Sequence, residues 1–364
     1  MKKFSQQMAL SVKDDLSLRY FDESTLFFDI ETTGFSAKHC SIYLIGCAYR
    51  NENQLTIQQF FAETPQEESL ILCAFLTLSE GFSSTLTFNG LGFDLPFIQE
   101  RCHQLELPEQ LNSLHHIDIF KLISPLKKVL KLPNLKQKSL EQFLSIERKD
   151  TYNGEELINV YLEYQKNPSE YQFHLMQLHN LEDVEGMLDI LPVLSYCDFF
   201  QGDFSFVGSK VISYQEYEGE QALELIFTLT PHHPFPKRIS YGKDDIYLTG
   251  FGNIVRLKIK IYQGELKYFY SNYKDYYYLP QEDMAIHKSV AFYVDKNFRT
   301  RAKAATCYSK KTGKFLPQYM TIFTPYFKLE YHDKISYIEM TEEFTGSKEF
   351  QMNYILHLLS MLVK

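Results

Sequence analysis

The spacing of apolar and polar residues divides the chain into two parts with different patterns. In the first part, stretches in which apolar residues occupy alternate positions are separated by stretches in which they recur every third or fourth position. The first spacing predicts β-strands and the second predicts α-helices. The predicted strands are 25–31, 41–50, 54–61 and 84–90. The predicted helices are 65–80, 118–130, 139–144, 153–165 and 170–193. A further helix is predicted to begin near Asp94.

From about residue 198 onwards the pattern changes. Short β-rich runs alternate with Gly and Asn turns, and aromatic residues crowd together, as in "KYFYSNYKDYYYLP" at 267–280. This predicts a mostly β domain that closes with a helix at 347–364. Because 364 residues exceed one ordinary core, we expect two domains, 1–197 and 198–364. The opening hairpin and later strand–helix alternation predict an α/β fold with a mixed sheet in the first.

The composition predicts a soluble protein. Hydrophobic residues make up 45% of the chain, and no apolar run approaches the roughly 18 residues that a membrane span needs. The opening residues "MKKFSQQMALSVKDD" lack the apolar stretch of a secretory signal. The six cysteines form no CxxC pair, which is typical of reduced thiols. We expect a cytoplasmic protein that does not bind membranes.

The net charge of −9 argues against a polyanionic partner, but the charge is unevenly spread. Residues 287–318 hold eight Lys or Arg and one Asp, and residues 121–138 hold six lysines and no acid. In the first of these segments, aromatic and basic residues alternate, a combination that suits single-stranded nucleic acid. The residues concerned are Phe292, Tyr293, Phe298 and Tyr308 with Lys296, Arg299, Arg301 and Lys303. The alternative is a β core with buried aromatics and solvated cations.

Two acidic residues interrupt an apolar strand in "FFDIETTGF", residues 27–35. Asp29 and Glu31 point the same way because strand side chains alternate. Burying two like charges together is costly unless a basic residue, protonation or a cation offsets the repulsion. The flanking residues contain no Lys or Arg, so a divalent cation with oxygen ligands is the simplest answer. An exposed strand end with solvated carboxylates is the alternative.

Two further segments add acids in contexts that suit a site. "TFNGLGFDLPF", residues 87–97, places Asp94 after a strand and a Gly-rich turn, as a metal ligand or as a helix cap. "HNLEDVEGM", residues 179–187, places Asp183 one helical turn after His179, so both share one face. A lone histidine on a helix is more often structural than catalytic, so its position beside an acid is what draws attention.

Together the three segments resemble the motifs of the DEDD 3′–5′ exonucleases of the ribonuclease H-like superfamily. The resemblance is closest to the bacterial YprB-type ribonuclease H-like proteins, which are predicted exonucleases. The similarity covers roughly residues 24–195, including the segment that begins "HIDIFKLISPLKKVLKLPNLKQKSLEQFL". One DEDD subgroup has Tyr four residues before its last Asp, and another has His five residues before it. Here His179 stands four residues before Asp183, which leaves the geometry of a catalytic base open.

The resemblance implies hydrolysis of phosphodiester bonds in single-stranded DNA or RNA with two divalent ions, Mg²⁺ or Mn²⁺. It implies that Asp29 bridges both ions, that Glu31 and Asp183 complete the site of the nucleophilic water, and that Asp94 holds the second ion. His179 would accept the proton of that water or orient it. The expected substrate-binding residues are Thr32, Thr33, Gly34, Asn89, Phe93, Lys296, Arg299, Arg301 and Lys303.

Two other functions remain open. One is a catalytically weak or inactive nucleic-acid-binding protein on the same fold, although four intact acids favour the enzyme. The other is a transposase- or resolvase-type endonuclease, which fits less well because such enzymes usually lack the paired Asp29 and Glu31 with His179. The sequence points to no protein partner.

Overall fold

The computed structural model describes residues 1–10, 14–51, 54–149, 152, 154–215, 219 and 221–364. The chain divides into two compact units. The first unit contains residues 1–199 and 233–237, and the second contains residues 200–232 and 238–364. Among the described residues, no helix has the length and apolar character that crossing a membrane requires.

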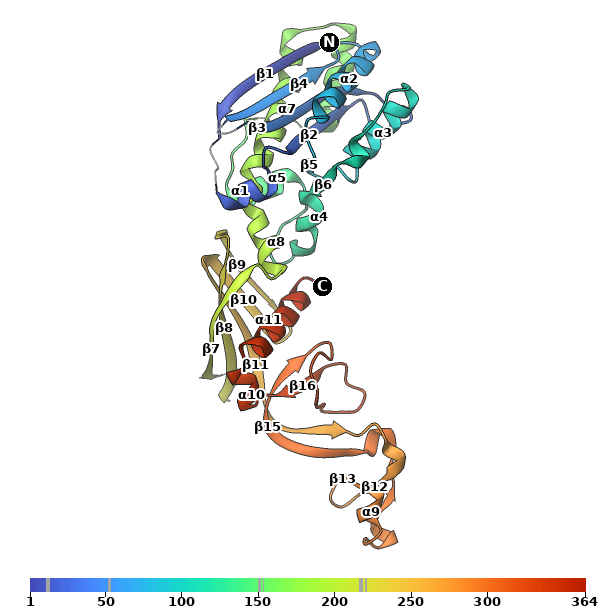
Figure 1. The fold of residues 1–364 in the computed structure, drawn as a ribbon, viewed down its shortest axis with the longest axis vertical. Helices are drawn as coiled ribbons and strands as arrows, with labels where there is room; N and C mark the ends of the chain where they lie inside the picture. Colours follow the sequence, from blue (N-terminus) through green and yellow to red (C-terminus); the bar gives the residue numbers. More distant parts are fainter. Residues whose placement is uncertain (11–13, 52–53, 150–151, 153, 216–218, 220) are drawn as a thin grey trace. The chain divides into compact units, whose positions relative to one another are not determined.

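The first unit is built on a mixed six-stranded sheet in the order β1-β4-β3-β2-β5-β6 (Figure 1). Its first four strands pair antiparallel, whereas β5 pairs parallel with β2 and β6 pairs parallel with β5. The strands are β1 (Lys2–Ala9), β2 (Thr25–Thr32), β3 (Ile42–Asn51), β4 (Gln54–Phe61), β5 (Ser84–Thr87) and β6 (His115–Asp118). This arrangement confirms the predicted α/β fold with a mixed sheet.

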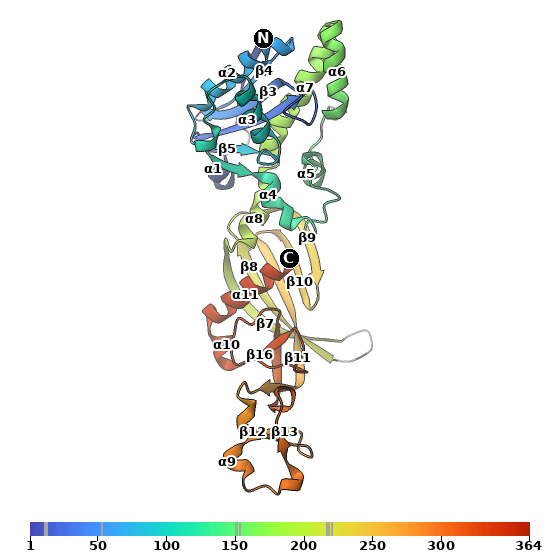
Figure 2. The same cartoon turned by 90° about the vertical axis from the view of Figure 1, so that its right-hand side faces the viewer.

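Helices cover both faces of this sheet, with α2 and α3 on one face and α7 on the other (Figures 1 and 2). Leu26, Phe28 and Ile30 of β2 pack in the core beneath α2 and α3. The alternate positions Asp29 and Glu31 therefore face α7. The helices of this part are α1 (Asp15–Tyr20), α2 (Glu68–Ser79), α3 (Asp94–Gln104), α4 (Ile119–Ile123), α5 (Gln137–Leu144), α6 (Gly154–Lys166), α7 (Glu170–Asp189) and α8 (Leu194–Phe200).

Two predicted helices are shorter than expected because proline interrupts them. The stretch predicted as one helix at 118–130 is α4 followed by a 3₁₀ turn that contains Pro125. Likewise, the helix predicted at 170–193 ends as α7 at Asp189, and a 3₁₀ turn with Pro192 leads into α8. Proline lacks the N–H that would continue each helix. The helix predicted at 153–165 is α6, and residue 153 lies outside the described residues.

The second unit is mostly β, as predicted, and contains two antiparallel sheets. The larger sheet runs β16-β15-β11-β10-β9, with β8 also paired to β11 and β7 paired to β8; the smaller runs β13-β12-β14. Their strands are β7 (Phe204–Gln215), β8 (Gln221–Pro231), β9 (Phe235–Lys243), β10 (Ile246–Gly252), β11 (Ile254–Phe269), β12 (Tyr276–Leu279), β13 (Met284–His287), β14 (Thr300–Arg301), β15 (Tyr308–Gln318) and β16 (Ser336–Glu339).

Short helices complete this unit: α9 (Lys288–Ala291), α10 (Glu342–Gly346) and the closing helix α11 (Lys348–Leu362). Helix α11 packs on the larger sheet through Tyr354, whose hydroxyl donates to the carbonyl of Pro317 and whose ring contacts Phe227. The final helix predicted at 347–364 is therefore present.

Candidate active site

Strand β2 supplies two carboxylates to the face of the sheet that α7 covers. Asn180 of α7 donates its amide N–H to Oδ2 of Asp29 at 3.2 Å, and Gln59 donates to Oδ1 of Asn180 at 2.9 Å. On β3, Gly46 is the residue that pairs with Asp29 of β2. A Cβ atom at Gly46 would lie 2.0 Å from Oδ1 of Asn180. Only glycine therefore leaves room for α7 to approach the strand that carries Asp29 and Glu31.

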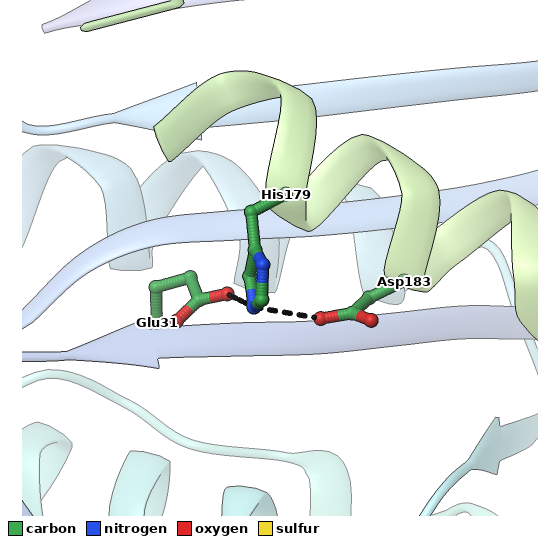
Figure 3. Close-up of side chains that lie close together, drawn as sticks. All are labelled: Glu31, His179 and Asp183. Atoms are coloured by element: carbon green, nitrogen blue, oxygen red, sulfur yellow. Dashed lines mark ion pairs between the residues drawn. The ribbon is translucent and has the colours of Figure 1, made fainter. Parts of the chain in front are cut away.

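Helix α7 brings His179 and Asp183 to the same place. Nε2 of His179 lies 3.6 Å from Oε1 of Glu31 and 3.3 Å from Oδ2 of Asp183. One ligand atom from each of these three residues lies within 4.8 Å of the other two, and their side chains converge in Figure 3. His179 is 5% exposed and Glu31 is 8% exposed. A histidine four residues before the last acid is thus aimed at both carboxylates.

Asp94, the first residue of α3, lies beside the same strand. Its Oδ1 accepts a hydrogen bond from the backbone N–H of Ile30 at 3.1 Å, and the residue is 5% exposed. Burial raises the pKa of Asp94 to about 7, and the charges of Asp118 and Asp183 add to the increase. The hydrogen bond from Ile30 opposes this shift, because it favours the ionised form.

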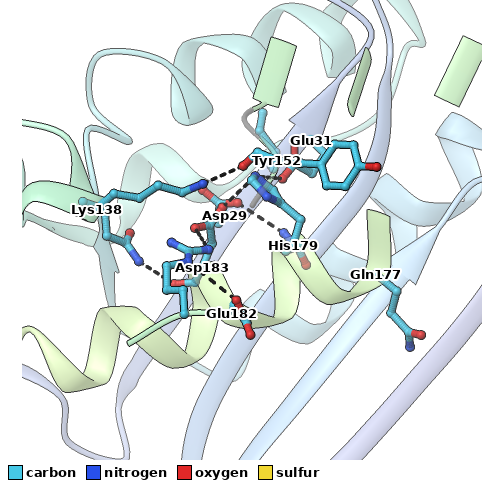
Figure 4. Close-up of polar contacts among 12 residues, drawn as sticks. Asp29, Glu31, Lys138, Tyr152, Gln177, His179, Glu182 and Asp183 are labelled. Atoms are coloured by element: carbon cyan, nitrogen blue, oxygen red, sulfur yellow. Dashed lines mark hydrogen bonds and ion pairs between the residues drawn. The ribbon is translucent and has the colours of Figure 1, made fainter. Parts of the chain in front are cut away.

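The pKa of Asp29 is affected by the charges of all three other predicted ligands. Burial raises the pKa of Asp29 well above its ordinary value, and the charges of Asp94, Asp183 and Glu31 raise it further. The hydrogen bond from Asn180 favours the ionised form but does not reverse the shift. Figure 4 shows Asp29, Glu31 and Asp183 grouped around His179. The structure therefore places Glu31, His179 and Asp183 within 4.8 Å of one another, and Asp29 and Asp94 complete this acidic cluster through the mutual effect of their charges.

A fifth acid, Asp118, supports the turn before Asp94. It is 3% exposed and accepts hydrogen bonds from the backbone N–H groups of Asn89 and Leu91 at 2.9 and 3.1 Å. The same carboxylate caps α4. Sequence reasoning placed position 118 only at the start of a helix. An acid at the start of a helix is a recognisable capping signal. The hydrogen bonds that Asp118 accepts from the Gly-rich turn are long-range contacts, which no local pattern predicts.

An arginine that sequence reasoning missed also contacts the cluster. Nη2 of Arg148 lies 2.6 Å from Oδ1 of Asp183, and its Nη1 lies 3.2 Å from Oε1 of Glu141. Its Nε lies 3.7 Å from Oε2 of Glu182. The side chain of Arg148 is 10% exposed, and that of Glu141 is 2% exposed. Arg148 pairs with Oδ1 of Asp183, which leaves Oδ2 directed at His179.

Replacing Arg148 with Met is expected to destabilise the metal-free protein by about 3–5 kcal/mol, because it leaves the buried Glu141 and the partly buried Asp183 without their counter-charge. Urea unfolding in a chelator measures the change. Lys166→Met is the matched control, since Lys166 pairs with Glu163 on the surface of α6 and such exposed pairs contribute about 0–1 kcal/mol. Equal stability of Arg148→Met and wild type would show that Glu141 and Asp183 do not depend on the arginine.

The end of β2 and the loop that follows contain three of the predicted substrate-binding residues. The register between β2 and β3 shifts between Glu31 and Thr32, as in a β-bulge, a feature common beside active sites. Oγ1 of Thr32 donates to the carbonyl of Gly34 at 2.8 Å, and Oγ1 of Thr33 accepts from the backbone N–H of Ser41 at 2.9 Å. Both hydroxyls thus shape this loop next to Glu31.

Two more predicted contacts lie in the turn before α3. Asn89 adopts a left-handed conformation with φ of 63°, and Phe93 directly precedes Asp94. The ring of Phe93 lies 6.5 Å from that of Phe35, which is 77% exposed. Both loops therefore flank the acidic cluster. The other four predicted contacts, Lys296, Arg299, Arg301 and Lys303, belong to the second unit.

The residues of the cluster fit a divalent cation. Within the part of the chain that the structure describes, neither Asp29 nor Asp94 forms an ion pair with a lysine or arginine. Their raised pKa values show that ionising both in the metal-free protein is unfavourable. Carboxylate oxygens are the ligands that hard cations such as Mg²⁺ and Mn²⁺ prefer. A cation would thus relieve the repulsion that Arg148 leaves in place.

One family model and several solved structures are similar to parts of this chain. Residues 26–195 match the family model described as the RNase_H superfamily. A family B DNA polymerase from the archaeon Pyrobaculum calidifontis is 14% identical, with a TM-score of 0.39 over 47% of this chain and 24% of that chain. Exonuclease I of E. coli in complex with a dT13 oligonucleotide is 11% identical, with a TM-score of 0.35 over 57% of this chain and 55% of that chain.

The chain thus spans about a quarter of the polymerase and just over half of exonuclease I. No curated protein matches it. The family match and the mixed sheet flanked by helices identify residues 26–195 as a ribonuclease H-like domain. On one face of this domain, Glu31, His179 and Asp183 lie close enough together to hold a metal ion.

Proposed function

We propose that the protein is a divalent-metal-dependent nuclease that hydrolyses single-stranded DNA or RNA from the 3′ end. The observation that carries the proposal is the convergence of Glu31, His179 and Asp183 within 4.8 Å, beside the partly buried Asp29 and the buried Asp94. The 3′ to 5′ direction rests on the resemblance of the three acidic motifs to the DEDD exonucleases. Cleavage from an end, rather than within the strand, rests on the same resemblance.

The acids and the histidine take different roles in this mechanism. Asp29, Glu31, Asp94 and Asp183 would hold two ions, Mg²⁺ or Mn²⁺. When bound, the ions supply Lewis-acid stabilisation of the charge that develops on the phosphate and on the leaving oxygen. His179, held between Glu31 and Asp183, would orient the attacking water or accept its proton.

Arg148 and Asn180 keep this arrangement in place from outside. Arg148 occupies Oδ1 of Asp183, so the other oxygen stays directed at the cluster. Asn180 likewise fixes the orientation of the Asp29 carboxylate by donating a hydrogen bond to its Oδ2. Such supporting contacts fix the orientation of ligand side chains.

The terminal nucleotide would bind between the two loops that flank the acids. We assign the backbone of Thr32, Thr33 and Gly34 to one side of the nucleotide, since the threonine hydroxyls are already engaged within their loop. Asn89 and Phe93 would position its other side.

The proposal is tested with short single strands of DNA and RNA labelled at the 5′ or the 3′ end, beside circular strands of the same composition. We expect 5′-labelled strands to shorten stepwise, 3′ label to appear at once as mononucleotide, and circles to remain intact. Hydrolysis is expected with Mg²⁺ or Mn²⁺ and not in excess chelator. A preparation of Asp29→Asn protein, purified in parallel, controls for contaminating nucleases.

The other outcomes separate the alternative functions. Cut circles would identify an endonuclease and contradict the exonuclease proposal. Binding of strands without hydrolysis under any metal condition would favour the inactive nucleic-acid-binding protein instead.

A further inference from the structure

The basic segment of the second unit displays aromatic rings on its surface. Between α9 and β14, Phe292, Tyr293 and Phe298 are 77%, 86% and 50% exposed. Phe292 and Tyr293 lie edge to face, with their ring centroids 5.5 Å apart. The fourth aromatic residue that the sequence groups with them behaves differently. Tyr308 is 5% exposed and donates its hydroxyl to Asp283, so it belongs to the core.

Other aromatic residues fill the interior of this region. The buried residues Ala285, Ala302 and Cys307 are surrounded by partly buried tyrosines of the neighbouring strands and turns. These tyrosines are Tyr270, Tyr273, Tyr276 and Tyr278. The three exposed rings are therefore not needed to complete the core beneath them. Large exposed aromatic side chains in one short segment mark an interaction surface.

Seven of the eight positive charges of the basic segment, residues 287–318, fall into two groups. Three lysines are used within the unit: Lys288 pairs with Asp275, Lys310 with Asp283, and Lys311 with Glu339. A second group consists of the four cations between residues 296 and 303. Within the described residues, these four form no ion pair with an acidic side chain; they are Lys296, Arg299, Arg301 and Lys303. Their charges thus remain available to a partner.

Two of these cations are held in a fixed place next to the aromatic rings. The guanidinium carbons of Arg299 and Arg301 lie 5.0 and 4.6 Å from the ring centroid of Tyr277 on β12. Arg299 also donates a hydrogen bond to the carbonyl of Ala291, the residue before Phe292. Cation–π contacts and this hydrogen bond restrict the arginines without neutralising them. The four cations and the three exposed rings thus belong to one short segment, residues 292–303, which follows α9, the helix labelled in Figure 2.

We propose that this surface binds a single-stranded nucleic acid, which stacks its bases on the rings and places its phosphates against the cations. The surface, named here the strand-binding surface, consists of Phe292, Tyr293, Phe298, Lys296, Arg299, Arg301 and Lys303. Flat apolar bases joined by anionic phosphates complement both of its features. In a duplex the bases are stacked inside the helix and cannot stack on the rings, so only its phosphates could contact this surface. The inference rests on the proposed function in taking nucleic acid as the partner.

Fluorescence anisotropy with a labelled oligothymidylate tests the proposal, in chelator so that no hydrolysis occurs. The full chain is compared with a triple variant, Phe292→Ala, Tyr293→Ala and Phe298→Ala. We expect the triple variant to bind at least about tenfold more weakly, because each stacked base contributes substantially to such binding. An abasic strand of equal length should bind to the wild type and to the triple variant with equal affinity, since it has no base to stack.

A second variant separates charge from stacking. Replacing Lys296, Arg299, Arg301 and Lys303 with Gln should weaken binding of both strands and reduce the slope of log affinity against log salt by about 3. The matched control for the triple aromatic variant is Tyr247→Ala with Phe251→Ala. These two aromatic side chains of β10 are 43% and 61% exposed and belong to the same unit. The control should bind like wild type.

Three results would overturn the inference. They are wild-type affinity in the triple variant, an equal loss on the abasic strand, and concentration-dependent self-association that the triple variant abolishes while strand binding is unchanged. The last result would assign the rings to a second copy of this chain. If a multiple variant unfolds, Phe292→Ala and Tyr293→Ala tested singly decide the question, since both side chains are largely exposed.

Failure of the proposed nuclease activity would look different. In that case the wild type would bind strands through this surface and hydrolyse none of them with any metal. Conversely, hydrolysis that persists while the triple variant keeps wild-type affinity would reject the strand-binding surface and leave the nuclease intact.

Discussion

Asp29→Asn is expected to lower the rate of strand hydrolysis by at least about a thousandfold, since ligands to catalytic ions support several kcal/mol of transition-state stabilisation and each 1.4 kcal/mol is tenfold. Asp29 is the acid on which the charges of Asp94, Asp183 and Glu31 all act, and in the proposed mechanism it would help to hold the ions. Asparagine has nearly the same shape but lacks the charge. The variant should therefore fold normally.

The reading of this experiment depends on two further measurements. Thermal melting in Mn²⁺ and in chelator should show a metal-dependent stabilisation in the wild type that is lost in Asp29→Asn. Asp189→Asn is the matched control, because Asp189 is an acid of the same helix as Asp183 but lies at its end, outside the cluster. Full activity of Asp29→Asn, or unchanged hydrolysis by the wild type in chelator, would refute the metal mechanism.

The parts of the site that depend on local periodicity are the parts that the sequence predicts. Asp29 and Glu31 share a face because strand side chains alternate, and His179 and Asp183 share a face because they are one helical turn apart. Asp94 is placed by a turn whose glycines are visible in the sequence. These short-range rules say which way each side chain points, and the mixed sheet then brings the faces together.

The supporting residues could not be predicted in this way. Arg148 reaches Asp183 across 35 positions of sequence, and Gln59 reaches Asn180 across 121. No local sequence pattern predicts these two contacts, because they depend on how α5, α7 and the sheet pack against one another. For the paired Asp29 and Glu31, the sequence leaves a basic residue, protonation or a cation as ways to offset the repulsion. In the structure, the pKa of Asp29 is raised, and an arginine, Arg148, pairs with the neighbouring Asp183.

The fold shows the same division between local and long-range information. Strands β2, β3 and β4 follow the predicted alternation closely. Strand β1 went unpredicted because its sequence, "KKFSQQMA", is mostly polar, as suits an exposed strand at the edge of the sheet. Strand β6 has four residues, too few for a period to be read. In the second unit, only tertiary packing separates the buried Tyr308 from the exposed Tyr293.

The stability of the metal-free protein is expected to fall as pH rises, through the titration of Asp94. Its pKa is about 7 in the folded state, against about 3.9 for an ordinary aspartate. A group whose pKa is raised by folding stabilises the folded state below the unfolded pKa, and this contribution is lost as pH rises through the folded pKa. The contribution of Asp94 should therefore decline between about pH 4 and pH 7, by about 4 kcal/mol in total.

Asp94→Asn isolates this effect from other groups that titrate in the same range. Burial lowers the pKa of His357, for example, which makes the folded protein less stable as pH falls. Asparagine can still accept the hydrogen bond from Ile30 but does not titrate. In urea unfolding with chelator, the variant should be more stable than the wild type near pH 8, and the difference should shrink as pH falls toward 5.

Divalent metal should narrow the difference in stability between the two proteins at high pH. Because the ionised Asp94 is the form that holds a cation, Mg²⁺ or Mn²⁺ at about a hundred times its dissociation constant should restore about 2.7 kcal/mol to the wild type near pH 8. The variant, with one ligand removed, should gain less. Parallel pH profiles of wild type and Asp94→Asn in chelator, or equal stabilisation of both by metal, would contradict the placement of Asp94 in the metal site.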